Sequence, residues 1–296
     1  MQLGRLGVWA PMDVMTAAEG AAFAQQVEAW GYAALWLPES RGRNVLAHSA
    51  WLLANTTELI IAPGIANIYA RDPMAMANGQ RGLNEQSGGR FLLGIGVSHA
   101  PTVTGLRGHT YGKPVATMRS YLREMQLAPY LAPEPPEKPL TILAALGPRM
   151  MALSGELADG AHPYNVPPEH TAEARRILGA GKLLCPEVWV LLETDPAKAR
   201  SAARQALAPY MQLDNYANNW RRIGFADELA DGGSDRFIDA NVAWGDEAAI
   251  RRRIQEHWDA GADHVCIQTI SPDGSRRPDE KLLAMLAPGR AASPRP

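Results

Sequence analysis

The chain has 296 residues, of which 46% are hydrophobic and 20% charged, so it can bury a large core as one α/β domain or two smaller ones. Its net charge of −2 excludes a broad basic surface, and we expect no nucleic-acid partner. No apolar run reaches the ~18 residues of a membrane span, and the start is too short in apolar residues for a secretory signal, so we expect a cytoplasmic protein without a membrane segment.

Helix-start signals recur along the chain, each just after a short apolar run. A capping box covers residues 16–19, Asp72 and Asp195 each precede a proline, and Asp246 precedes a glutamate. The glycines that can end the helices are Gly31, Gly88, Gly160 and Gly261. A strand-like run begins within a few residues of most of them, which predicts a repeating unit of helix, glycine and strand.

Eight apolar runs are strand candidates, and they are continuous rather than alternating, which indicates strands covered on both faces. In chain order they span 4–10, 33–39, 58–66, 90–98, 140–147, 160–166, 187–194 and 263–270. Their alternation with helices predicts a closed (β/α)₈ TIM barrel. A doubly wound open sheet is the alternative, although no GxGxxG follows the first strand. Cys185 and Cys266 lie in apolar runs without CxxC spacing, so we expect reduced core thiols.

One long polar stretch interrupts the alternation before the last strand. Residues from about 195 to 246 are too many for one helix, and we expect a helical insertion there. We therefore predict one barrel domain over residues 1–286, followed by a flexible C-terminal tail over residues 287–296.

In such barrels the active site lies where the strands end, so the residues after each apolar run indicate the chemistry. The histidines form no HxH or HExxH motif, so we expect no metal, and no GxSxG motif is present for a nucleophilic serine. Only Glu39 and Glu193 are strand-end acids, far apart in barrel order, which disfavours glycoside hydrolysis. The remaining strand-end residues are Trp, Tyr, Asn, Ser and Gly, which suit a planar cofactor.

The strand that ends at Gly147 is a candidate anion site. Pro148 can open a helix whose free N–H groups and dipole would favour a phosphate, and Arg149 could add charge. The same residues would also fit an ordinary strand-to-helix turn with an exposed arginine.

Several of these segments together resemble a known family. They read GVWAP, WLPES, APGIANIYARDP, GRFLLGIGVSHAP, ALGPRM, LADGAHPYNVPPEHT and LLETDPAKAR. This combination is similar to the luciferase-like monooxygenase superfamily, and within it to the F420-dependent oxidoreductase branch common in actinobacteria. The resemblance spans nearly the whole chain, and it implies a bacterial luciferase-like barrel with an insertion before the last strand.

The resemblance also implies a flavin-type ring at the barrel mouth, with its phosphate near the ends of the fourth and fifth strands. A non-prolyl cis peptide, which would back the ring, maps onto Gly64–Ile65. The expected cofactor-binding residues are Trp9, Gly64, Ile65, Asn67, Val97, Ser98, Gly147, Pro148, Arg149, Tyr164 and Asn165. Loop cations that could meet a long anionic tail are Arg41, Arg43, Arg71, Arg107 and Lys113.

The proton-transfer residue is where this chain departs from the family. Several F420 enzymes carry a histidine just after the second strand, whereas this chain has PESRGRN there. The catalytic candidates are Glu39, which falls on the family's second-strand acid or histidine, and His99. His48 lies too far into the next helix to be assigned this role.

The function expected from the resemblance is F420-dependent hydride transfer between C5 of the deazaflavin and a small organic substrate. An FMN-dependent luciferase-like monooxygenase is the close alternative, and a non-catalytic barrel that binds flavin or deazaflavin is another. Family members often dimerise through the helices after the second and third strands. We therefore expect a homodimer, and we expect it to bind a small-molecule substrate.

Overall fold

The computed structural model describes residues 1–271 and 274–289, so the predicted tail lies outside the described residues from position 290 onward. The strands are β1 (Leu6–Trp9), β2 (Ala34–Leu37), β3 (Ile60–Pro63), β4 (Ala66–Asn67), β5 (Leu93–Gly96), β6 (Thr141–Ala144), β7 (Gly160–His162), β8 (Leu183–Leu184), β9 (Glu187–Leu192), β10 (Val242–Gly245) and β11 (Val265–Thr269). The helices are α1 (Ala17–Ala29), α2 (Val45–Ala54), α3 (Pro73–Ser87), α4 (Pro114–Leu127), α5 (Pro148–Leu157), α6 (Pro168–Leu178), α7 (Pro196–Met211), α8 (Asp214–Trp220), α9 (Asp235–Asn241), α10 (Glu247–Asp259) and α11 (Glu280–Leu286). All eight predicted strands are present.

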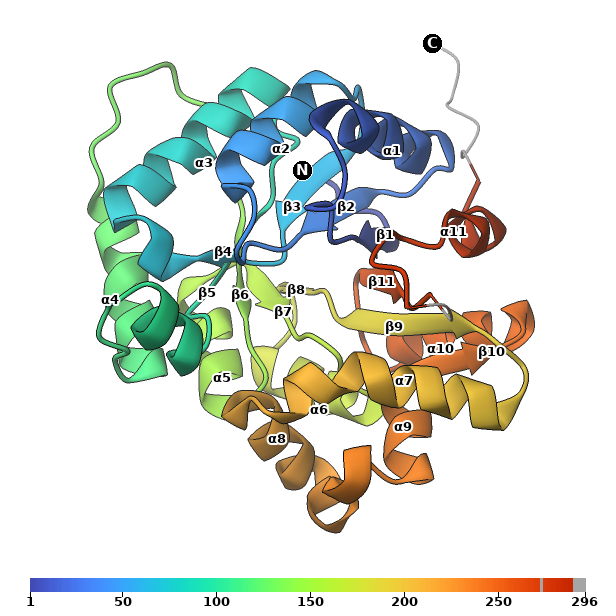
Figure 1. Cartoon of the computed structure of the whole chain (residues 1–296). Helices are drawn as coiled ribbons and strands as arrows, with labels where there is room; N and C mark the ends of the chain where they lie inside the picture. Colours follow the sequence, from blue (N-terminus) through green and yellow to red (C-terminus); the bar gives the residue numbers. More distant parts are fainter. Residues whose placement is uncertain (272–273, 290–296) are drawn as a thin grey trace.

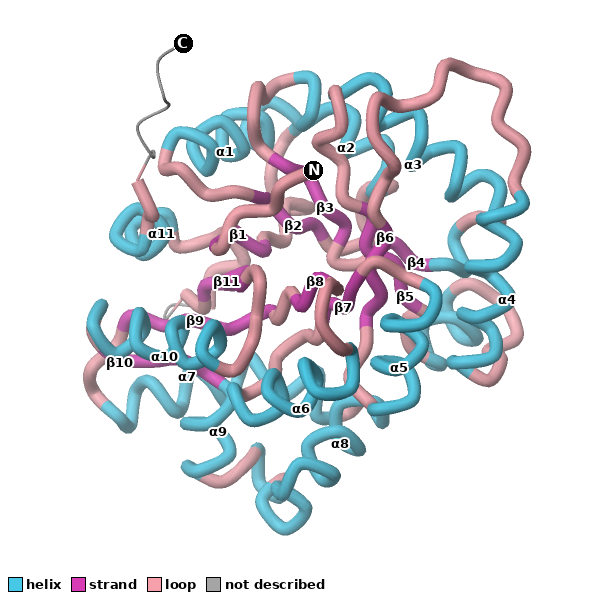
Figure 2. Tube along the Cα trace, turned by 180° about the vertical axis from the view of Figure 1, so that it is seen from behind, coloured by secondary structure: helices cyan, strands magenta, loops and turns pink. Residues whose placement is uncertain are grey.

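The strands other than β10, which lies at the edge of its sheet, form one parallel ring. One sheet has the order β10-β9-β11-β1-β2-β3 and the other β4-β5-β6-β7-β8. A parallel bridge between Ile61 and Phe91 joins β3 to β5, and on the opposite side β8 runs through Cys185 and Pro186 into β9. The strands lie at the centre and the helices surround them (Figures 1 and 2). This arrangement confirms the predicted TIM-barrel fold.

The predicted helix starts are confirmed at the level of individual hydrogen bonds. Thr16 and Glu19 form the capping box of α1, and Asp72 accepts from the backbone N–H of Ala75 at the start of α3. Asp195 and Asp246 cap α7 and α10 in the same way. These signals are local, and for that reason they can be read from the sequence.

The predicted insertion contains helices α7, α8 and α9, which lie together at one side of the barrel (Figure 1). It also contains β10, which the sequence analysis did not predict and which pairs in parallel with residues 189–192 of β9. The apolar run of β10 is only four residues long and directly follows α9, so it carries little signal of its own.

The interior of the barrel is built around aromatic rings. Trp36 is fully buried, stacks on His162 with ring centroids 4.5 Å apart, and donates from Nε1 to His264 Nε2 over 3.0 Å. Cys185 and Cys266 are free and buried in the same interior, which confirms the prediction of core thiols.

Buried histidines make the stability of the fold depend on pH. Burial lowers the pKa of His162 and His264 to about 4 and that of His257 to about 3. The same side chains protonate near pH 6.5 once unfolded, so between pH 6.5 and about 4 the unfolded chain binds more protons than the folded one.

We therefore predict that the free energy of unfolding falls as the pH is lowered from 7 to 4. Each of these histidines contributes a slope of up to about 1.4 kcal/mol per pH unit. Urea unfolding across this range measures the slope. His257→Gln should flatten it, and His109→Gln, at an exposed position, should leave it unchanged. Equal slopes for both variants and the wild type would contradict the prediction.

Candidate functional site

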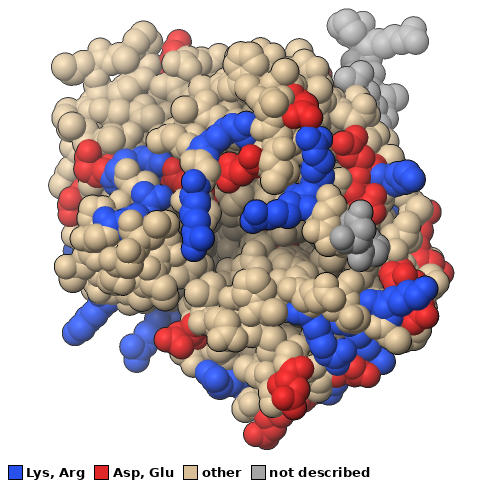
Figure 3. Space-filling model, in the orientation of Figure 1, with Lys and Arg blue, Asp and Glu red and all other residues tan. Residues whose placement is uncertain are grey.

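The carboxyl ends of the parallel strands share one face of the barrel, where the predicted site residues lie. The space-filling view shows a hollow on this face over the centre of the barrel, with lysine and arginine side chains around it (Figure 3). A concave surface rimmed by cations suits a ligand that carries negative charge.

Gly64 and Trp9 form part of the floor of the mouth. The Gly64–Ile65 peptide bond, between β3 and β4, is cis, and Trp9 Nε1 donates to the Gly64 carbonyl oxygen over 3.0 Å. A Cβ atom at position 64 would lie 2.8 Å from Trp9 Nε1 and 2.9 Å from His162 Nε2. Only glycine therefore fits here without displacing a ring.

Glu39 is held in place by several groups. Its carboxylate forms an ion pair with Arg71, the two side chains being 4% and 8% exposed, and it accepts from the backbone N–H groups of Val45 and Asn67. Asn67 is itself buried, and its Oδ1 accepts from the backbone N–H of Tyr69. These contacts join the loop after β2 to the segment after β4.

His99 lies in the loop after β5 and contacts the insertion. Its Nδ1 is 3.1 Å from Asn215 Oδ1 in α8, and its ring centroid is 5.7 Å from that of Tyr216. Burial lowers its pKa. Glu39 therefore connects two loops of the barrel, whereas His99 connects the barrel to the insertion.

The start of α5 has the geometry predicted for an anion site. Gly147 is its N-cap, and no side chain among the described residues caps the helix. A Cβ atom at Gly147 would meet no described atom within 4 Å, and Pro148 and Arg149 are exposed. His170 Nε2 lies 2.8 Å from the Leu146 carbonyl oxygen, which fixes the turn before the helix.

Val97 and Ser98, which follow β5, are half-buried beside this turn in barrel order. Ser98 has a positive φ of 56°, an uncommon conformation for a residue with a side chain. Its carbonyl oxygen accepts from the Tyr111 hydroxyl over 3.3 Å. The backbone after β5 is thereby turned and tied to the following loop.

Three of the five loop cations are bonded to other groups of the protein. This corrects the expectation that they could meet the anionic tail of the cofactor. Arg71 pairs with Glu39, Arg107 donates to the Ser40 carbonyl oxygen over 3.4 Å, and Arg43 donates to the carbonyl oxygens of Met12 and Met15. The other two loop cations, Arg41 and Lys113, are exposed, and so is Arg149 at the start of α5.

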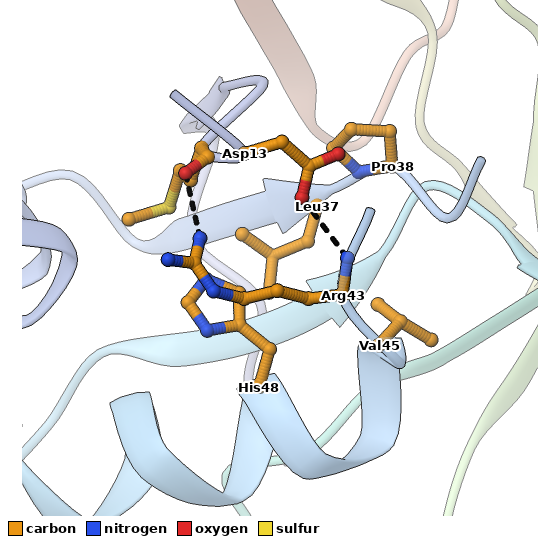
Figure 4. A pocket seen from close by; sticks show the side chains of 7 residues that line it. Asp13, Leu37, Pro38, Arg43, Val45 and His48 are labelled. Atoms are coloured by element: carbon orange, nitrogen blue, oxygen red, sulfur yellow. Dashed lines mark hydrogen bonds between the residues drawn. The ribbon is translucent and has the colours of Figure 1, made fainter. Parts of the chain in front are cut away.

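A small pocket lies behind the loop after β2 (Figure 4). Asp13, Arg43 and His48 line it, and the Arg43 backbone N–H donates to Asp13 Oδ1 over 3.1 Å. His48 is buried, its Nε2 has no hydrogen-bond partner within the described chain, and burial lowers its pKa to about 4. The pocket therefore lies between the loop after β1, the loop after β2 and the start of α2.

Tyr164 joins the barrel to the insertion. Its hydroxyl donates to Gln268 Oε1 over 2.7 Å, so it accepts from the hydroxyl of Tyr210 in α7, 2.9 Å away. Its ring centroid lies 5.4 Å from that of Trp9. Burial raises the pKa of Tyr164 well above 10. The sequence analysis missed Tyr210 because the insertion carried no strand-end signal.

Asn165 and Glu187 form a buried polar pair that the sequence analysis recognised only in part. Asn165 has a φ of 52°, and its backbone N–H donates to Glu187 Oε2 over 2.9 Å. Both side chains are fully buried, and burial raises the pKa of Glu187 well above its usual value. The only sequence signal for Glu187 is an acid at the start of an otherwise apolar strand.

Comparison with solved structures supports the fold. The chain superposes with a TM-score of 0.74 on an F420-dependent secondary alcohol dehydrogenase in complex with an F420–acetone adduct, at 16% identity and 97% coverage of both chains. It superposes with a TM-score of 0.69 on the FMN complex of the oxygenating constituent of 3,6-diketocamphane monooxygenase from Pseudomonas putida, at 14% identity and 96% and 97% coverage.

Comparison of sequences identifies the family. A Mycobacterium tuberculosis protein named as a candidate coenzyme F420-dependent oxidoreductase is 26% identical, over 97% of this chain and 99% of its own. The sequence model described as Luciferase-like monooxygenase matches residues 2–264. Because this match covers most of the chain, the protein belongs to the luciferase-like monooxygenase family.

Proposed function

We propose that this protein is an F420-dependent oxidoreductase that transfers hydride between C5 of the deazaflavin and a small organic substrate. The observation that carries the proposal is the combination, on one face, of the Trp9–Gly64 floor with the uncapped start of α5. The first suits a flat ring and the second an anionic tail. The M. tuberculosis relative, named for the same cofactor, supports this choice.

The cofactor would be held by residues from several strand ends. We assign the ring to the floor and its rim, and the phosphate to the backbone N–H groups at the start of α5. Ring contacts are proposed for Trp9, Gly64, Ile65, Asn67, Tyr164 and Asn165, and tail contacts for Val97, Ser98, Gly147, Pro148 and Arg149. Coenzyme F420 has a longer anionic tail than FMN, and the exposed Arg41 and Lys113 can meet it.

When bound, the deazaflavin supplies or accepts the hydride, and the protein orients the reactants and excludes water. The contacts of Glu39 favour a positioning role, because Arg71 and two backbone N–H groups already occupy its carboxylate. Those of His99 likewise favour a role in holding α8 against the barrel.

The cofactor is tested by titrating the protein with F420 and with FMN while tryptophan fluorescence is recorded. We expect quenching with micromolar or tighter affinity for F420 and none for FMN. Binding of FMN alone would replace the proposal with the flavin monooxygenase alternative. Binding of neither would contradict both enzyme functions, and F420 binding without turnover of any substrate would favour a non-catalytic barrel.

The floor is tested with Gly64→Val. We expect the variant to bind F420 at least about 10-fold more weakly, because its side chain would displace Trp9 or His162. Gly105→Val is the matched control, since a Cβ atom there meets no described atom within 4 Å. Unchanged affinity in a folded Gly64→Val variant would show that the floor does not contact the cofactor.

We also propose a cytoplasmic homodimer. The free, buried cysteines are typical of a reducing compartment. Trp51 on α2 and Met74 on α3 are 44% and 48% exposed, so each of the helices after β2 and β3 carries one exposed large apolar side chain.

The dimer is tested by light scattering after gel filtration. The expected mass is twice the chain mass of 32.1 kDa. Trp51→Lys with Met74→Lys should lower it to that of one chain, because both substitutions place a charge on the helices proposed to form the interface. A single-chain mass for the wild type would rule the dimer out.

A further inference from the structure

Gln268 is a polar side chain in the last interior layer of the barrel before the mouth. In β11 it lies two residues after Cys266, which is buried in the barrel interior, and side chains two residues apart in a strand point to the same face. It is paired in register with Trp189 of β9, and the register between β11 and β1 continues to Trp9 at the same level. Gln268 therefore lies beside the floor of the mouth.

Gln268 is also the most accessible side chain of this layer. Trp9, Trp189 and Tyr164 are 7%, 3% and 9% exposed, whereas Gln268 is half-buried. The hollow in the space-filling view lies over the centre of the barrel, where this layer ends (Figure 3). Gln268 thus borders the space that a ligand at the mouth would occupy.

One hydrogen bond determines which end of the Gln268 amide remains free. The Tyr164 hydroxyl donates to Oε1 over 2.7 Å, and the hydroxyl of Tyr210 in α7 donates in turn to that of Tyr164. Burial holds the pKa of Tyr164 well above 10, so this donor keeps its proton at neutral pH. Oε1 is therefore occupied, and Nε2 has no hydrogen-bond partner among the residues that the structure describes. The free end of the amide is a donor with two N–H groups.

Gln268 lies across the mouth from the proposed phosphate site. The barrel strands follow one another in the order β1, β2, β3, β5, β6, β7, β9 and β11, so β11 is opposite β5 and β1 is opposite β6. β5 leads to Val97 and Ser98, and β6 leads to Gly147 and α5. A ring whose tail leaves toward these residues turns its other long edge toward Gln268. In deazaflavins and flavins this edge carries the C4 carbonyl oxygen, next to the position that exchanges hydride.

On the basis of the function proposed above, we propose that Gln268 is a cofactor-binding residue whose Nε2 donates a hydrogen bond to the C4 carbonyl oxygen of the deazaflavin ring. This bond fixes the rotation of the ring in its own plane, which a flat floor leaves free. Because the C4 carbonyl is conjugated with C5, the same donor also favours hydride transfer to C5. Tyr164 and Tyr210 act as positioning residues, since they hold the amide in the orientation that leaves Nε2 free.

The contact is tested by nuclear magnetic resonance of the ¹⁵N-labelled full-length protein. The side-chain NH₂ signals of Gln268 are those that Gln268→Met lacks. We expect F420 to shift them downfield, because a hydrogen bond to a carbonyl oxygen deshields the donor proton. The signals of Gln126, exposed near the end of α4 and identified with Gln126→Met, should stay in place. Gln268 signals that do not move at saturation with F420 overturn the proposal.

Affinity gives a second readout. Gln268→Met should bind F420 about 5- to 10-fold more weakly, because it loses one hydrogen bond at nearly constant side-chain volume. Gln126→Met makes the same substitution away from the mouth and should bind as the wild type does. Tyr164→Phe should shift the Gln268 signals before any ligand is added, because the amide loses the bond that orients it. Wild-type affinity in a folded Gln268→Met variant overturns the proposal.

Failure of the proposed function is recognised separately. If the wild type binds FMN and not F420, that function is contradicted, and FMN, which carries the same carbonyl, becomes the probe for Gln268. If the wild type binds neither, the probe is lumiflavin, the flavin ring without a tail. A shift of the Gln268 signals by the ring supports the contact in either case, and unmoved signals overturn it.

Discussion

The hydrogen bond from Trp9 to the Gly64 carbonyl oxygen is the contact on which the barrel mouth depends. Gly64 also donates its own N–H to the Leu37 carbonyl oxygen over 2.7 Å, so both of its backbone polar groups are bound, one to β1 and one to β2. Glu39 continues the connection by holding Asn67. Three neighbouring strand ends are thus fixed before any ligand arrives, which is the pre-organisation that a cofactor platform needs.

The fold could be predicted largely from sequence because its signals are local. Capping residues such as Asp72 act within one turn of their helix, and continuous apolar runs mark strands covered on both faces. The cis bond at Gly64–Ile65 could be predicted for another reason, because the resemblance to the family implied it. The short β10 was missed because its pairing with β9 is a long-range contact.

The direction in which polar side chains point could not be predicted in the same way. Arg71 lies in a loop at the mouth, but its guanidinium forms an ion pair with the buried Glu39. A buried carboxylate is stable only with a counter-charge beside it. Glu187 shows the converse, an acid that begins a strand and lies inside the barrel. Both outcomes depend on which groups the closed ring brings together, and no periodicity along the chain encodes that.

The pairing of β10 with β9 has a consequence for how the protein can diversify. Helices α7 to α9 leave the barrel after β9 and return to it through a strand that adds to the same sheet. Both ends of the inserted segment are therefore anchored to one rigid edge. Residues of the inserted helices can therefore be substituted during evolution without a change in the geometry of the strand ends.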